Sequence, residues 1–140
     1  MRVVLTDLTT KRWQGVNVNN IQKVVDEFSG REVFGEVRSE NDQIPFISLS
    51  NSTHNIKNIN LEDNMIKGDL QFLGNSRGIE AQELFNMGMI KLSIRAFGIP
   101  PSDIHKIITW DLVFDEDFKM KKRLKKIDQI ITDYEDTDNI

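Results

Sequence analysis

The chain has 140 residues, no cysteine and a formal net charge of -4. This length fits one domain with a core of its own, and the lack of thiols excludes disulfides and thiolate metal sites and favours a reducing compartment. A negative net charge argues against electrostatic binding of nucleic acid by the chain as a whole. Because no segment has the apolar length of a signal peptide or a membrane span, we expect a cytoplasmic protein without a membrane partner.

The first part of the chain predicts a strand, a helix and a second strand. Residues 2–7 are rich in β-branched residues, as strands are, and residues 31–37 have a similar pattern. Between them, apolar residues spaced i, i+3, i+4 and i+7 predict a helix over about 19–29, with Asn19 or Asn20 as its N-cap. The apolar positions of that helix are Ile21, Val24, Val25 and Phe28.

The middle of the chain predicts further strands and a turn. Residues 44–49 are a candidate strand with Pro45 near its start, where a missing N–H does least harm. Residues 53–62 and 65–73 are expected to pair as a hairpin that turns at 63–64.

The next part predicts a helix followed by two strands. Ser76 can cap a helix over about 77–87, which Gly88 would end. The segment 89–98 alternates apolar and polar residues, which predicts a strand with one apolar and one wet face, and 105–114 predicts another strand.

The C-terminal segment is predicted to be a helix over roughly 116–134 with an acidic tail. A narrow apolar stripe runs along it, which the domain or another chain has to cover, and we expect a partner subunit to do so. The stripe consists of Leu124, Ile127, Ile131 and Tyr134. Six basic residues crowd its other faces between Lys119 and Lys126. A solvated helix face explains them better than contact with nucleic acid.

Strands outnumber helices and the two do not alternate regularly, which predicts an α+β fold. We expect a mostly antiparallel sheet or small barrel flanked by helices in residues 1–115, followed by the helix and tail of residues 116–140.

Four segments in order resemble the prohead maturation proteases of tailed bacteriophages, a family similar in fold to the herpesvirus assemblin proteases. They are the helix at 19–28 with VFGEV after it, the stretch ISLSNSTHNIKNINLEDNMIKGDLQFL, the stretch NSRGIEAQELFNMGMIKLSIRAFG, and ITWDLVFDED. Together they cover about residues 15–118. The resemblance implies a serine protease fold.

The resemblance places the family's nucleophile at Ser93, on the polar face of the predicted strand 89–98. Arg95 follows on the same face and could hold a backbone segment or an anion. The family's catalytic histidine position holds Ser39, and Glu40 stands where the family has proline. Because serine cannot act as a general base at neutral pH, the site is expected to be degenerate. A plain serine on a wet strand face is the competing interpretation.

Only two histidines are present, His54 and His105. His54 could approach Ser93 across the sheet and replace the lost base, although a partly exposed strand histidine is the simpler interpretation. No residues have metal-ligand spacing and no phosphate-binding loop is present, so no cofactor or metal is expected.

Two functions therefore compete. The first is a bacteriophage head-assembly or virion structural protein with a prohead protease fold and no activity. It would be a homo-oligomer, working in the host cytoplasm and in the prohead or virion with capsid, scaffold, portal or neck proteins. The alternative is an active serine endopeptidase that cleaves scaffold and capsid proteins through Ser93 and His54.

Overall fold

The computed structural model describes residues 1–38, 46–98, 104 and 106–115. The strands are β1 (Arg2–Asp7), β2 (Val33–Gly35), β3 (His54–Glu62), β4 (Met65–Phe72), β5 (Ile90–Phe97) and β6 (Lys106–Phe114). The helices are α1 (Val18–Asp26) and α2 (Ser76–Asn86), and two short 3-10 helices lie at Lys11–Trp13 (η1) and Leu49–Asn51 (η2).

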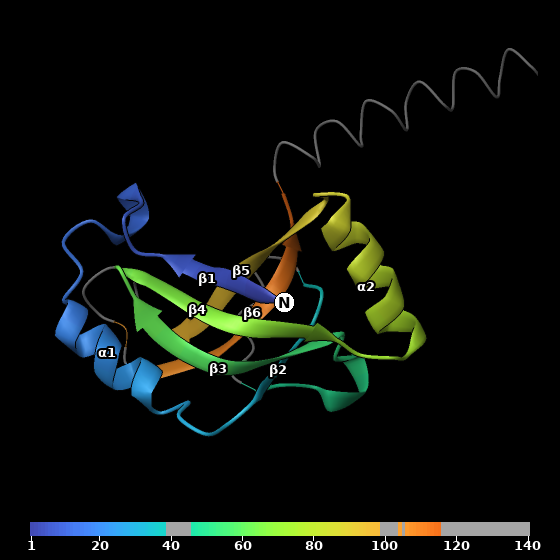
Figure 1. Cartoon of the computed structure of the whole chain (residues 1–140), viewed down its shortest axis with the longest axis horizontal. Coiled ribbons are helices and arrows are strands. Elements are labelled where there is room, and N and C mark those ends of the chain that lie inside the picture. The colour runs from blue at the N-terminus through green and yellow to red at the C-terminus, as the bar shows by residue number, and fades with distance from the viewer. Residues whose placement is uncertain (39–45, 99–103, 105, 116–140) are drawn as a thin grey trace, which may run out of the picture.

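The strands form two antiparallel sheets, one of four strands in the order β1-β4-β3-β2 and one of the pair β5-β6. Figure 1 shows the two sheets stacked, with α1 and α2 at opposite ends of the stack. The predicted α+β class with an antiparallel core is confirmed, and the described strands do not close into a barrel.

Residues 33–38 pair with both sheets in one continuous stretch. Val33–Gly35 pairs with β3, and two residues later Val37 makes a parallel bridge to Leu112 of β6. The Leu112 N–H donates to the Glu36 carbonyl at 2.8 Å, and the Arg38 N–H donates to the Leu112 carbonyl at 2.9 Å. The predicted strand 31–37 is therefore divided between two sheets, which its sequence pattern does not indicate.

The local signals at turns and helix ends are only partly predictive. The hairpin turn lies at Asp63 and Asn64, both with positive φ (51° and 61°), as a two-residue β-hairpin turn requires. Gly88 ends α2 with φ of 74°, and its N–H donates to the Phe85 carbonyl at 3.0 Å.

The N-caps and one strand differ from the prediction. Asn17 caps α1 in place of Asn19 or Asn20, and Asn75 caps α2 in place of Ser76. In each helix the side-chain oxygen of this asparagine accepts the backbone N–H of the residue three positions later. The predicted caps already lie inside the helices, so they do not occupy the N-cap position. The candidate strand 44–49 is wrong in its described part, because residues 46–48 have no strand partner and η2 begins at Leu49.

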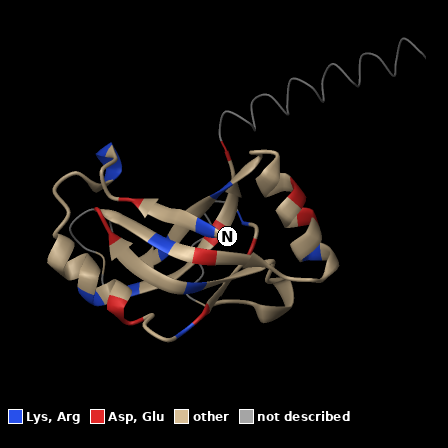
Figure 2. Ribbon diagram, in the orientation of Figure 1, with Lys and Arg blue, Asp and Glu red and all other residues tan. Residues whose placement is uncertain are grey.

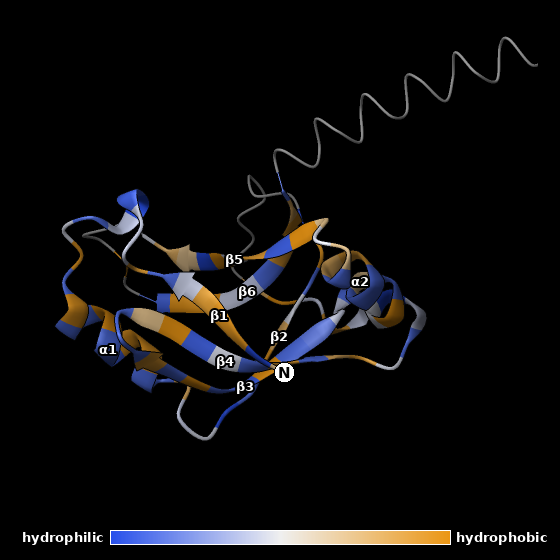
Figure 3. Cartoon of the chain, turned by 45° about the horizontal axis from the view of Figure 1, so that its top comes forward, coloured by the Kyte–Doolittle hydropathy of each residue, from blue (hydrophilic) through white to orange (hydrophobic). Residues whose placement is uncertain are grey.

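The core lies between the two sheets and under α1. Its fully buried members come from both sheets and the helix: Ile21, Val25, Ile56, Ile66 and Trp110. Apolar and polar residues alternate along the strands in Figure 3, as expected for sheets with one face toward a core. The Trp110 indole N–H donates to the Thr6 hydroxyl at 2.8 Å, so even the largest core side chain has its polar atom satisfied.

Among the described residues, no helix is both long and apolar enough to cross a membrane. The predicted C-terminal helix, its stripe of Leu124, Ile127, Ile131 and Tyr134, and the segment 116–140 lie outside the described residues.

Candidate functional site

Ser93 lies in the middle of β5, directly opposite Asp111 of β6. Its side chain is half-buried, and Arg95, two residues along the same face, is only 1% exposed. The predicted wet face of this strand is therefore wrong at Arg95, because an oppositely charged partner is available inside the fold.

Arg95 and Asp111 form a buried ion pair with two hydrogen bonds. The Arg95 Nε and Nη2 atoms donate to the two Asp111 carboxylate oxygens, each at 2.8 Å. The Arg95 Nη1 atom donates to the Phe46 carbonyl at 2.9 Å. This paired geometry is the strongest that an arginine and a carboxylate make, and it fixes the backbone at Phe46 against β5.

A second ion pair continues this network. The Glu36 N–H donates to Asp111 Oδ1 at 3.1 Å, and the Glu36 carboxylate accepts the Ser48 N–H at 2.9 Å. Arg38 Nη1 lies 3.4 Å from Glu36 Oε2, and their side chains are 7% and 9% exposed. We did not identify Asp111 and Glu36 as site residues from the sequence. The available signal was a charged residue inside an otherwise apolar strand pattern.

His54, in contrast, is fully buried and turned toward the Trp110 backbone. Its Nε2 lies 2.8 Å from the Trp110 carbonyl oxygen, and its Nδ1 lies 2.8 Å from the Thr53 hydroxyl. Because a carbonyl only accepts, Nε2 must carry the proton, and Nδ1 then accepts from Thr53. Burial lowers the pKa of His54 below its usual 6.5, which keeps the ring neutral.

Gly35 makes this position of the His54 ring possible. A Cβ atom on Gly35 would lie 2.3 Å from His54 Nε2 and 2.4 Å from the Trp110 carbonyl oxygen. The glycine in VFGEV is therefore needed for the close approach of β2, the histidine ring and β6.

The structure thus brings Ser93, Arg95 and Asp111 onto one face, whereas both ring nitrogens of His54 are bound elsewhere. No hydrogen bond joins Ser93 to His54 in the described part of the chain. Ser39, Glu40 and His105 lie outside the described residues. Nor do the described residues contain a group of three or more potential metal ligands.

Searches against protein-family models, curated proteins and solved structures find no match to this chain.

Proposed function

We propose that this chain is a head-assembly or virion structural protein of a tailed bacteriophage, built on a prohead-protease-like fold without protease activity. The proposal starts from the ordered resemblance of four segments to that family. The observation that supports the inactive form is the state of His54, whose two nitrogens are both bound inside the core.

A serine nucleophile needs a base that can take its proton. Ser39 stands at the family's base position and cannot do so. For His54 to serve instead, its unprotonated Nδ1 would have to leave the Thr53 hydroxyl, and this hydroxyl would lose its partner in the core.

The neighbours of Ser93 also suit a structural role. Asp111 could in principle orient a catalytic imidazole, but both of its oxygens already accept hydrogen bonds from Arg95. Arg95 could stabilise an anionic intermediate, but its Nη1 atom donates to the Phe46 carbonyl. Both side chains are thus engaged in holding the described part of the fold together, which supports a structural role for them over one as base orienter or oxyanion donor.

The test is cleavage of the scaffold and capsid proteins encoded in the same genome. Wild type and Ser93→Ala should both stay at the uncatalysed background, and the intact mass of the chain should not change during the incubation. Ser39→His, which restores the family's residue, is the informative gain-of-function variant. Cleavage by wild type that disappears in Ser93→Ala would show an active endopeptidase and contradict the proposal.

A further inference from the structure

A groove of about 720 Å³ opens between the residues 36–38 and helix α2. Val37 and Phe114 line it on the side of the sheets, and Ala81 and Leu84 line it on the side of the helix. None of the residues Ser93, Arg95 and Asp111 lines it. This volume is in the range of sites that bind small ligands or a few residues of a peptide.

The groove exists because a strand partner ends early. The pairing of β2 with β3 stops where the Thr53 N–H donates to the Gly35 carbonyl at 2.9 Å, and the preceding residues turn away as η2. The residues 36–38 nevertheless continue along β6. The strand position beside Val37, on the side away from β6, therefore has no occupant among the described residues.

The backbone of Val37 faces this empty position. Along a strand, the N–H and C=O of one residue point to the same side, and successive residues alternate. The Glu36 carbonyl and the Arg38 N–H both bond to Leu112 of β6, so the Val37 N–H and C=O point away from β6. Val37 itself lines the groove. Neither group has a hydrogen-bond partner in the described part of the chain.

We propose that this groove binds an extended segment of a different protein, which pairs as an added strand with the backbone of Val37. The backbone of an extended peptide supplies an acceptor for the Val37 N–H and a donor for the Val37 C=O at the spacing of a strand. Helix α2 forms the opposite wall of the groove. The proposal is independent of any role of Ser93 and of the phage assignment.

The lining of the groove indicates the chemistry of the segment. Its apolar wall consists of half-buried Val37, Leu84 and Phe114, which pack on the buried cluster of Ala81, Ile90 and Leu112. Phe46, which also lines the groove, is 68% exposed. These surfaces suit a segment with apolar side chains at alternating positions, since such side chains share one face of a strand.

The charges of the described residues that line the groove balance. Glu36 and Arg38 neutralise each other, which leaves Arg77 and Glu80 on α2, one of each sign. Arg77 Nη1 donates to the neutral Asn51 side-chain oxygen at 2.7 Å. Figure 2 shows both signs along this helix. The segment is therefore expected to carry no net charge, and its binding should depend on main-chain pairing and apolar contact.

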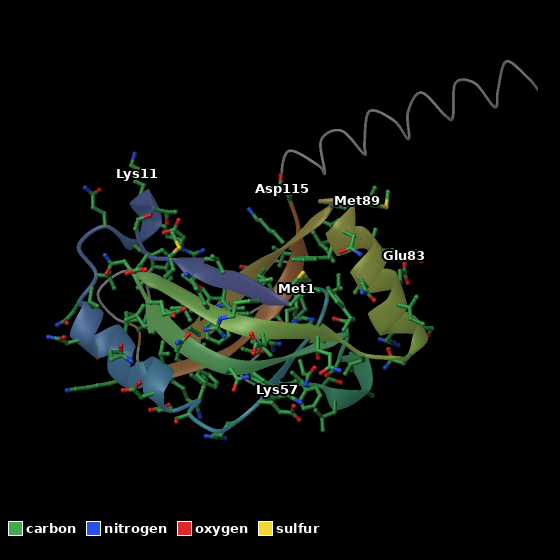
Figure 4. All side chains as sticks on the ribbon, in the orientation of Figure 1. Met1, Lys11, Lys57, Glu83, Met89 and Asp115 are labelled. Atoms are coloured by element: carbon green, nitrogen blue, oxygen red, sulfur yellow. The ribbon has the colours of Figure 1, made fainter. Side chains whose placement is uncertain are left out.

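Selection of binding peptides by mRNA display, with the full chain as the target, tests the proposed peptide binding. The library contains random peptides of about eight residues, long enough for one strand. Selected peptides should alternate apolar residues and carry no net charge. Glu80→Trp, which fills the groove from an exposed position of α2, should weaken their binding at least about tenfold. Glu83→Trp is the matched control, because Glu83 is also exposed on α2 (Figure 4) but does not line the groove.

Amide exchange gives the second measurement. In the free protein the Val37 N–H should exchange much faster than the Arg38 N–H, which is bonded to Leu112, and the selected peptide should protect it. A Val37 N–H that is already protected in the free chain would mean that the chain fills its own groove. Self-association that Glu80→Trp abolishes would mean that a second copy does. Either result overturns the proposal, as would a library without binders or binders equally tight on Glu80→Trp.

Discussion

Gly35 is the residue where three parts of the fold come closest. It lies against both His54 Nε2 and the Trp110 carbonyl oxygen, which are hydrogen-bonded to each other, and a methyl group there would lie within 2.4 Å of both. We expect Gly35→Ala to lower the free energy of unfolding by about 2–3 kcal/mol, because neither a backbone carbonyl nor a buried ring can move away cheaply. Gly74→Ala, where nothing lies within 4 Å, is the control and should change stability by less than about 0.5 kcal/mol. Urea unfolding measures both, and equal effects would contradict the packing described here.

His54 should make the fold sensitive to mild acid. Burial lowers its pKa in the folded state below 6.5, whereas the unfolded chain takes up the proton near that pH. The stabilisation is therefore fully present above about pH 6.5. It is lost as the pH falls toward the folded-state pKa, by up to about 1.4 kcal/mol per pH unit for one proton.

Urea unfolding between about pH 7 and pH 5 measures this slope, above the range in which ordinary carboxylates titrate. His54→Gln, which can still hydrogen-bond but does not titrate, should flatten the slope. An unaltered slope in His54→Gln would mean that the proton uptake belongs to other groups.

At the scale of the elements, the Arg95–Asp111 pair ties β5 and β6 to the residues 36–38 and to Phe46. Removing one partner leaves a buried charge, so Arg95→Met should lower the free energy of unfolding by about 3–5 kcal/mol. Adding Asp111→Leu to it should recover most of this loss, although the Glu36 N–H then lacks its acceptor.

The exposed ion pair of Lys91 with Asp115 is the control for the Arg95 and Asp111 variants. The Lys91 Nζ and Asp115 Oδ2 atoms are 3.8 Å apart, and the two side chains are 50% and 38% exposed. Lys91→Met should therefore lower the free energy of unfolding by no more than about 0.5 kcal/mol. The expectation fails if the double variant is no more stable than Arg95→Met alone. The fold would then need the hydrogen bonds of the pair, and removal of the unpaired charge would not be enough.

The elements that the sequence predicts well are those with a local cause. The turn at Asp63 and Asn64 needs two residues that tolerate positive φ, and Gly88 ends α2 for the same reason. The division of 31–37 between two sheets and the irregular path after Pro45 depend on contacts distant in the sequence, with Leu112 and Arg95. A single-sequence pattern carries no trace of them.

The candidate site was predictable to a similar extent. Alternation correctly places Ser93 and Arg95 on one face of β5, but it assigns that face to solvent. Only the partner strand reveals that Asp111 lies opposite and neutralises Arg95. Likewise, His54 could be expected to lie on a strand, whereas its inward turn depends on the missing side chain at Gly35.

At the scale of the molecule, the two sheets share one core and one connecting strand. Trp110 of β6 packs with Ile56 and Ile66 of the other sheet, and Val37 bridges to β6 directly after β2 leaves β3. The two-stranded sheet depends on the other, since two strands alone are marginal in water. The four-stranded sheet in turn buries apolar residues against Trp110 of β6. The sheets should therefore unfold together.

The two tryptophans report this directly, because Trp13 and Trp110 are 3% and 0% exposed in the folded chain. Their fluorescence and the β-sheet circular dichroism should follow a single urea transition with the same midpoint. In the variant Trp13→Phe, Trp110 is the only remaining tryptophan, so the fluorescence reports on β6 alone. Its urea midpoint should again equal that of the circular dichroism. If Trp110 emission changed at a lower urea concentration than the circular dichroism, β5 and β6 would detach first. The pairing of residues 36–38 with β6 would then be too weak to make the two sheets unfold together.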